Sequence, residues 1–224
     1  MDETLPEETV PAQPQREPES PRQEFKREAW ELVKLVALFL AVFWFLITFV
    51  VEGYVVQGPS MYPTLEDHER ILVFKLGHRL SQIPIFSAIE PIRESDIVVF
   101  DSRDEFDKRY IKRVIAVGPD RAPGNLVQAH SVDEAPAPGD VQVEFSRGQV
   151  WVDNHLLEEG YLEEVERRTS DSHPPLYLHA GEYYVLGDNR RVSKDSRAFH
   201  AVDDSQIIGR AVLRFWPLSR FGFL

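Results

Sequence analysis

Residues 35–51 read LVALFLAVFWFLITFVV, a run without a single charged side chain. Such a run is near the lower length limit for a helix that crosses a hydrocarbon core about 30 Å thick. Trp30 and Val33 extend the apolar character toward the N-terminus, and the long side chain of Lys34 can reach the membrane interface. We therefore predict a transmembrane anchor over residues 30–52.

Two other interpretations of this run are weaker. A cleaved signal peptide is disfavoured because a polar tail precedes the run and no small-x-small cleavage site follows Val51. A buried core helix is disfavoured because no polar stripe interrupts the run. The preceding residues 1–29 contain five prolines, many acids and almost no bulky apolar side chains. Such a segment cannot offset its ordering entropy, so we predict a disordered, acidic, proline-rich tail.

Basic residues determine the expected orientation of the anchor, because they are retained on the cytoplasmic side when they lie within about twenty residues of a span. After the run, only Arg70 lies in that window. We expect a single-pass protein of a plasma membrane or thylakoid-type membrane, with a cytoplasmic N-terminus and its body on the trans side. The basic residues that precede the run are Arg16, Arg22, Lys26, Arg27 and Lys34.

The composition excludes several kinds of site. The 224-residue chain is 43% hydrophobic, enough for a core, and it has no cysteine for a disulfide, a zinc–thiolate site or a cysteine nucleophile. Its net charge of −12 disfavours general binding to nucleic acid, which relies on a basic surface. The seven histidines show no HExxH spacing, and no glycine-rich nucleotide motif occurs. We predict no metal, no cofactor and no nucleic-acid partner.

Residues 53–224 are predicted to form a mainly β domain, because short runs rich in β-branched and aromatic residues recur along them. Residues 141–145 alternate between apolar and polar, and Ser146-Arg147-Gly148 is predicted to turn the chain into a second strand, which makes a hairpin. The other predicted strands are residues 54–57, 71–74, 96–100, 110–117, 183–186 and 207–215.

A small insertion is predicted around residues 120–180. Its first part, residues 120–140, is rich in Pro, Gly, Ala and Asp and is predicted to be a loop. Residues 78–92 and 195–206 are compatible with short helices.

A serine and a lysine indicate the chemistry. Ser60 lies in the proline-bracketed segment GPSMYPTL, residues 58–65. A serine hydroxyl is a weak nucleophile until a base removes its proton, and a lysine can be that base if burial keeps it neutral. Lys112 lies in the apolar strand YIKRVIAV, residues 110–117, where alternation sends Lys112 and Arg113 to opposite faces. We predict that Lys112 faces inward, and that Arg113 tolerates replacement by lysine far better than Lys112 tolerates arginine.

A third segment, GDNRRVSKDSR, follows at residues 187–197. Each segment alone has an ordinary interpretation: a solvated loop serine, an outward-facing lysine or a polar turn. Their order behind an anchor is a long and specific pattern. It resembles the type I signal peptidases, serine proteases with a Ser/Lys dyad that remove signal peptides from exported preproteins. The resemblance covers residues 35–224 and implies a signal-peptidase-like β-barrel or β-sheet catalytic domain.

The resemblance also implies a role for each matching residue. Ser60 would be the acylating nucleophile and Lys112 the general base. Ser193 would form a hydrogen bond with the lysine amine and orient it, and Met61 would be structural. The residues that would support the site by ion pairing are Asp188, Arg190, Asp195 and Arg197.

The implied substrate is a membrane-tethered preprotein with small residues at positions −3 and −1. It would add as a strand between the backbones of residues 55–58 and 109–112. The N–H of Ser60 would be one donor to the oxyanion, and Gly58 stands where some relatives carry a second, side-chain donor. The lipid bilayer is the other expected partner, and no oligomer is predicted.

Alternatives remain open at two points. Within enzymes, the chain could be a specialised Ser/Lys processing protease that acts on few substrates. Outside enzymes, it could be an inactive, membrane-anchored protein that binds exported chains, although the intact Ser60 and Lys112 argue against this. The late aromatic residues Trp216, Phe221 and Phe223 could pack in the core or touch lipid headgroups.

Overall fold

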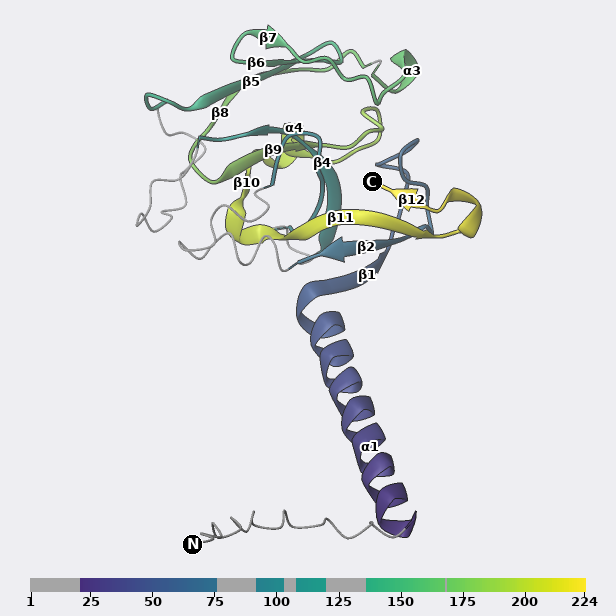
Figure 1. Ribbon diagram of the computed structural model, residues 1–224. Helices are drawn as coiled ribbons and strands as arrows, with labels where there is room; N and C mark the ends of the chain where they lie inside the picture. The colour runs from purple at the N-terminus through teal and green to yellow at the C-terminus, as the bar shows by residue number, and fades with distance from the viewer. Residues whose placement is uncertain (1–20, 76–91, 103–107, 120–135, 168) are drawn as a thin grey trace, which may run out of the picture. The chain divides into compact units, whose positions relative to one another are not determined.

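A computed structural model describes five stretches of the chain, which are residues 21–75, 92–102, 108–119, 136–167 and 169–224 (Figure 1). The chain divides into two units, one ending at Trp44 and one running from Phe45 to Leu224. Most of the possible helix at 78–92 and most of the predicted loop at 120–140 lie outside the described residues.

The N-terminal unit contains helix α1, Pro21–Phe45, and a π-helical turn, Leu46–Val50, continues it. Residues 21–29 are therefore helical, which contradicts the disorder predicted for this part of the tail. Residues 1–20 are not described. Proline suits the first turn of a helix, and the Arg, Gln, Glu and Lys residues that follow it are good helix formers. Residues 25–50 are long and apolar enough to cross a membrane, with a mean hydropathy of 2.5 in their most apolar stretch.

The second unit is mainly β, as predicted. Its larger sheet has the following strands: β1 Val51–Val55, β2 Arg70–Phe74, β3 Ile97–Asp101, β4 Arg109–Val117, β9 Glu182–Leu186, β10 Val202–Asp203, β11 Ile207–Trp216 and β12 Gly222–Phe223. All pairs are antiparallel in the order β1-β2-β11-β3-β4-β9-β10, with β12 on β11. Hydrogen bonds between the described strands do not close this order into a ring.

The described part of the predicted insertion forms a second sheet, ordered β7-β6-β5-β8. The predicted hairpin is present, since Phe145 pairs with Val150 and Arg147 and Gly148 turn the chain at positive φ. The strands are β5 Val141–Ser146, β6 Gln149–Val152, β7 His155–Leu156 and β8 Ser172–Leu178. Short helices among the described residues of the second unit include α3 Glu164–Arg167, α4 Ser196–Phe199 and the 3-10 turns Asp204–Gln206 and Leu218–Arg220.

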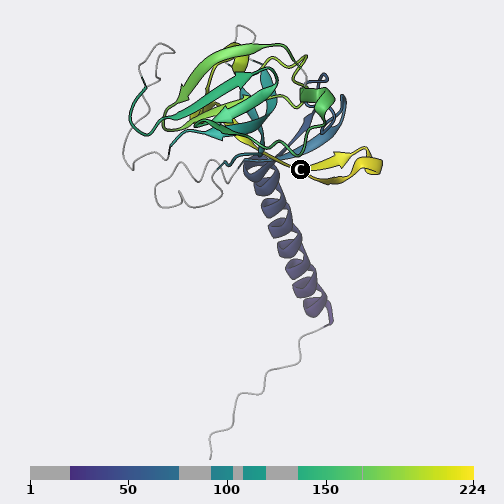
Figure 2. The same ribbon diagram turned by 90° about the horizontal axis from the view of Figure 1, so that it is seen from above.

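The smaller sheet covers strands β4 and β9 of the larger one (Figure 1), and its green strands lie in front when the molecule is seen from above (Figure 2). Apolar side chains fill the space between the layers, among them Ile115 of β4, Leu186 of β9 and Phe145 of β5. A second cluster surrounds Val98 and Val114, and a third surrounds Met61. Strand β4 is therefore buried on both faces, and this burial determines the surroundings of its polar residues.

The late aromatic residues are not core residues. Trp216, Phe221 and Phe223 are 51%, 58% and 86% exposed. The core-packing interpretation is therefore wrong for these three side chains. Leu218 between them is also exposed, so this end of the chain carries an apolar surface.

Candidate active site

The loop between β1 and β2 carries Ser60, and its shape is held by both backbone and core. The N–H of Val56 donates to the carbonyl of Glu69 at 2.8 Å, which closes the base of the loop. Met61 and Leu65 are fully buried in the cluster beneath it. The buried Met61 side chain packs in the core beneath the loop, while the neighbouring Ser60 remains partly exposed.

The Lys112 amine lies directly beside the Ser60 hydroxyl. Nζ donates to Oγ of Ser60 at 2.9 Å and to the carbonyl oxygen of Ile111 at 2.9 Å. Lys112 is only 3% exposed, in a strand paired on both sides by β3 and β9. The buried strand therefore restricts the positions that the Lys112 amine can take. It places this amine against a serine whose loop lies some fifty residues earlier in the sequence.

Burial makes this amine less basic. It lowers the pKa of Lys112 from 10.5 to about 8, because a charged ammonium loses hydration in the protein. The carboxylates of Asp195 and Asp188 act in the opposite direction. Each of these carboxylates has its own arginine partner, which weakens its pull on Lys112.

Asp188 is paired with Arg113, the residue next to Lys112. Nε and Nη2 of Arg113 donate to the two oxygens of Asp188 at 2.9 and 2.7 Å, and the hydroxyl of Thr64 donates to Asp188 at 2.5 Å. Arg113 also donates to the carbonyl of Ser95 at 2.9 Å. The prediction that Arg113 tolerates lysine far better than Lys112 tolerates arginine stays a prediction, but it rested on alternation alone and did not include this buried ion pair. The missing signal was the burial of β4 on both faces, which a single sequence does not reveal.

Arg113→Lys should lower both stability and activity. A lysine amine keeps the charge but cannot reproduce the parallel pair of hydrogen bonds to Asp188. Loss of one hydrogen bond to a charged group costs about 2 kcal/mol, and we expect a comparable loss in transition-state stabilisation, roughly tenfold or more in kcat/KM. Thermal unfolding and initial rates test this, with the exposed Arg147→Lys as the control. Near-normal rates and stability in a folded Arg113→Lys protein would show that the parallel pair of hydrogen bonds to Asp188 is not needed.

The other charged residues of the third segment are also paired. Arg190 binds the carboxylate of Glu159, with Nη1 at 3.0 Å from Oε2, and its Nε donates to the carbonyl of Gly187 at 3.0 Å. Asp195 accepts from the N–H of Gly187 at 3.0 Å and from Nε of Arg197 at 2.8 Å. The sequence suggested ion pairing for these residues but not the partners Arg113 and Glu159, and no motif marks Glu159.

Ser193 does not form the hydrogen bond with Lys112 that was expected. Its hydroxyl is buried and has no partner among the described residues, whereas the Lys112 amine bonds to Ser60 and Ile111. Ser193 packs instead against Gly187, where an added Cβ would lie 2.1 Å from its Oγ and 2.5 Å from the carbonyl oxygen of Ser60. Glycine at this position lets the third segment approach the serine loop closely.

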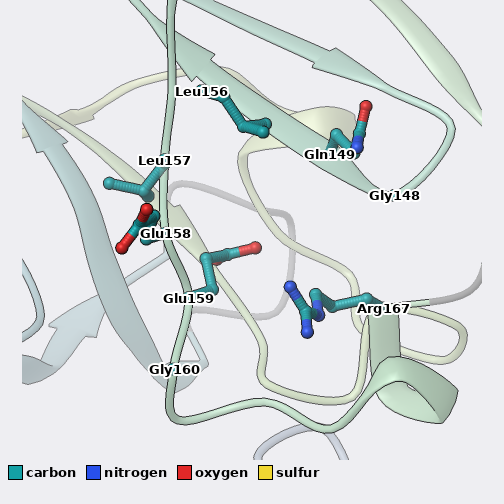
Figure 3. A pocket seen from close by; sticks show the side chains of 8 residues that line it. All are labelled: Gly148, Gln149, Leu156, Leu157, Glu158, Glu159, Gly160 and Arg167. Atoms are coloured by element: carbon teal, nitrogen blue, oxygen red, sulfur yellow. The ribbon is translucent and has the colours of Figure 1, made fainter.

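A cavity of about 250 Å³ lies at the smaller sheet, and Glu159 is among the residues that line it (Figure 3). None of the predicted site residues lines it. Among the described residues, no group of three or more His, Cys, Asp or Glu side chains is placed to hold a metal ion. Of the predicted catalytic residues, the structure places Ser60 and Lys112 in hydrogen-bond contact.

Comparisons with known proteins show the family of this chain. Residues 29–124 and 136–216 match the family described as signal peptidase, peptidase S26. Signal peptidase IB of Staphylococcus aureus (strain MRSA252) is 30% identical over 213 residues, covering 88% of this chain and 95% of the relative. The probable signal peptidase I-2 of Synechocystis sp. is 32% identical over 182 residues, covering 79% and 68%.

A solved signal peptidase I from Enterococcus faecalis V583 is 26% identical, with a TM-score of 0.38 over 54% of this chain and 97% of that one. The family match extends over most of the chain and includes the Ser60 loop, strand β4 and the third segment. This chain therefore belongs to the peptidase S26 family of type I signal peptidases.

Proposed function

We propose that this chain is a membrane-anchored serine endopeptidase that removes signal peptides from exported preproteins, with Ser60 as nucleophile and Lys112 as general base. The observation that supports it most is the 2.9 Å contact between the Ser60 hydroxyl and a buried amine whose pKa is lowered to about 8. A lysine with that pKa is partly neutral at physiological pH and can accept a proton.

The reaction follows from this contact. The neutral amine keeps an N–H on the carbonyl of Ile111 and turns its lone pair toward Ser60. The Ser60 proton moves to Nζ while Oγ attacks the carbonyl carbon of the scissile bond. The ammonium then protonates the leaving nitrogen, the C–N bond breaks, and an acyl-Ser60 remains. Water, deprotonated by the same amine, hydrolyses this ester and regenerates the enzyme.

In this proposal, a backbone N–H group stabilises the negative charge that develops on the carbonyl oxygen of the scissile bond. The N–H of Ser60 donates to no described residue, so it is available as an oxyanion donor. Gly58 adds no side-chain donor, and its own N–H donates to Asp67 at 2.8 Å. In this proposal the ion pairs of Asp188, Arg190, Asp195 and Arg197 hold the loops without touching the substrate.

The substrate would be a preprotein with small residues at −3 and −1, bound as an added strand between residues 55–58 and 109–112. Arg109 donates to Glu52 at 3.2 Å and to the hydroxyl of Tyr54 at 3.0 Å. These bonds link β1, which leads into residues 55–58, to β4, which contains residues 109–112. A peptide between them gains main-chain hydrogen bonds irrespective of its sequence, and side-chain size then decides selectivity.

Cleavage of a preprotein tests the proposal directly. The purified protein, incubated with a secretory preprotein, should release a mature chain whose new N-terminus follows a small-x-small sequence. Mass spectrometry identifies that terminus, and rapid acid quenching followed by peptide mapping should find the acyl group on Ser60. Binding of preprotein without any cleavage would favour an inactive binding protein instead.

In this proposal, α1 anchors the protein with its N-terminus in the cytoplasm, and the apolar surface at Trp216, Phe221 and Phe223 meets lipid headgroups. The helix supplies enough apolar length, and tryptophan and phenylalanine suit the membrane interface. Anchoring enzyme and substrate in one plane raises their effective concentration.

Reconstitution into sealed vesicles tests both membrane contacts. Protease added on the cytoplasmic side should trim the acidic tail and spare residues 53–224. The double change of Trp216 and Phe223 to serine should slow cleavage of a vesicle-bound preprotein about tenfold, by loss of apolar surface at the interface, but leave cleavage of a soluble peptide unchanged. The exposed Leu156→Ser on β7 is the control, and equal effects on both substrates would contradict the lipid contact.

A further inference from the structure

Glu159 is almost completely buried, although it lies outside the three segments that carry the Ser60, Lys112 and Asp188 motifs. It is 3% exposed, and its partner Arg190 is 1% exposed. Oε2 accepts from Nη1 of Arg190 at 3.0 Å, while Oε1 accepts from Nη2 of Arg190 and, at 2.7 Å, from the hydroxyl of Tyr161. Three donors therefore hold this buried side chain in one position.

A continuous set of bonds leads from Glu159 to the serine. Nε of Arg190 donates to the carbonyl of Gly187 at 3.0 Å. Two residues further on, the N–H of Asn189 donates to the carbonyl of Ser60 at 3.0 Å. The missing side chain of Gly187 allows this approach, since a Cβ would stand 2.5 Å from the same carbonyl. The position of Arg190 therefore influences the position of the Ser60 backbone.

Tyr161 adds a second route. The guanidinium carbon of Arg113 lies 4.1 Å from the centre of its ring, and Arg113 holds Asp188 through two hydrogen bonds. The segment that contains Glu159 and Tyr161 therefore contacts both arginines that fix residues 187–190. Two separate contacts on one loop restrict its rotation as well as its translation.

We propose that Glu159 is a positioning residue for peptide-bond cleavage: through Arg190 it holds residues 187–189 against the Ser60 carbonyl and so keeps the Ser60 hydroxyl at the Lys112 amine. The inference rests on the proposed roles of Ser60 and Lys112. It assigns the segment that follows β7 a positioning role in catalysis, because small displacements of reacting groups lower the rate by large factors.

The neighbouring Glu158 offers a matched control. Both glutamates line the cavity beside the smaller sheet, and their side chains point in different directions from the same backbone (Figure 3). Glu158 is exposed, whereas Glu159 faces Arg190. The same substitution at adjacent positions therefore separates the effect of the ion pair from the general effect of removing a negative charge.

The test compares Glu159→Gln, Tyr161→Phe and Glu158→Gln in the full-length protein. At a temperature well below the unfolding transition of each variant, Glu159→Gln should lower kcat about tenfold or more and leave KM within about twofold. Tyr161→Phe, which keeps the ring over Arg113, should lower kcat by a smaller factor. Glu158→Gln should match wild type.

Titration of acylatable Ser60 separates positioning from folding. If Glu159→Gln has fewer active sites but normal turnover per site, Glu159 only stabilises the fold and the inference is overturned. If Glu159→Gln does not fold, a folded Tyr161→Phe with unchanged kcat overturns it equally. Failure of the proposed function itself looks different, because wild type would then form no acyl-Ser60 at all.

Discussion

Ser60→Ala should abolish preprotein cleavage while the protein remains folded. The change deletes one oxygen from a partly exposed side chain, and the loop around it stays pinned by Met61 and by the bond from Val56 to Glu69. Loss of a nucleophile in a serine protease lowers kcat by a factor on the order of 10⁶. Initial rates and mass spectrometry of the products measure this loss directly.

A matched deletion of one hydroxyl serves as control. Ser172 lies exposed on β8, where its hydroxyl forms a hydrogen bond with that of Ser146 at 3.3 Å. Ser172→Ala should cleave at the wild-type rate. Equal rates would show that loss of a hydroxyl elsewhere does not impair cleavage. Substantial turnover by a folded Ser60→Ala protein would remove Ser60 from the reaction.

Lys112→Arg should be as inactive as Lys112→Ala, a loss of about 10⁴-fold or more. Arginine keeps the charge at a similar length, but a guanidinium does not lose its proton at ordinary pH and so cannot act as a base. A general positive charge near Ser60 would be preserved by the change, whereas a proton acceptor would not. Near-normal rates for Lys112→Arg would make the lysine structural and place the base elsewhere.

The pH profile of the wild type tests the same group independently. Only the neutral amine accepts the Ser60 proton, so kcat/KM should rise with pH and level off above the pKa of Lys112, which burial lowers to about 8. Well below that pKa, the rate should fall about tenfold for each pH unit. A profile that is flat between pH 6 and pH 9 would contradict Lys112 as the base.

Stability should follow the same titration. Below pH 8 the ammonium is present in both folded and unfolded chains, and its burial destabilises the fold. Between about 8 and 10.5 the folded chain has released this proton and the unfolded chain has not, so stability rises with pH by about 3 kcal/mol from this group. Lys112→Met removes that dependence, and the difference in unfolding free energy between the two proteins should shrink or reverse as pH rises.

Local pattern was enough to locate most elements. The apolar run predicts α1, and alternation with a turn at Arg147 and Gly148 predicts the β5–β6 hairpin, because these depend on neighbours in the sequence. The start of α1 was missed, since composition suggested disorder where helix-forming side chains follow Pro21. The exposure of Phe223 was left open, because aromatic residues suit both a core and a membrane interface.

The kind of chemistry could be read from the sequence, as a loop serine, a strand lysine and a charged third segment behind an apolar helix. Which of these groups touch depends on how strands that are distant in the sequence pack together. Strand β11, near the C-terminus, pairs between β2 and β3, and the smaller sheet buries the second face of β4. That burial lowers the pKa of Lys112, makes Arg113 a buried partner of Asp188 and brings Glu159 to Arg190. Such contacts join residues far apart in sequence, and their energies depend on desolvation, which no local pattern records.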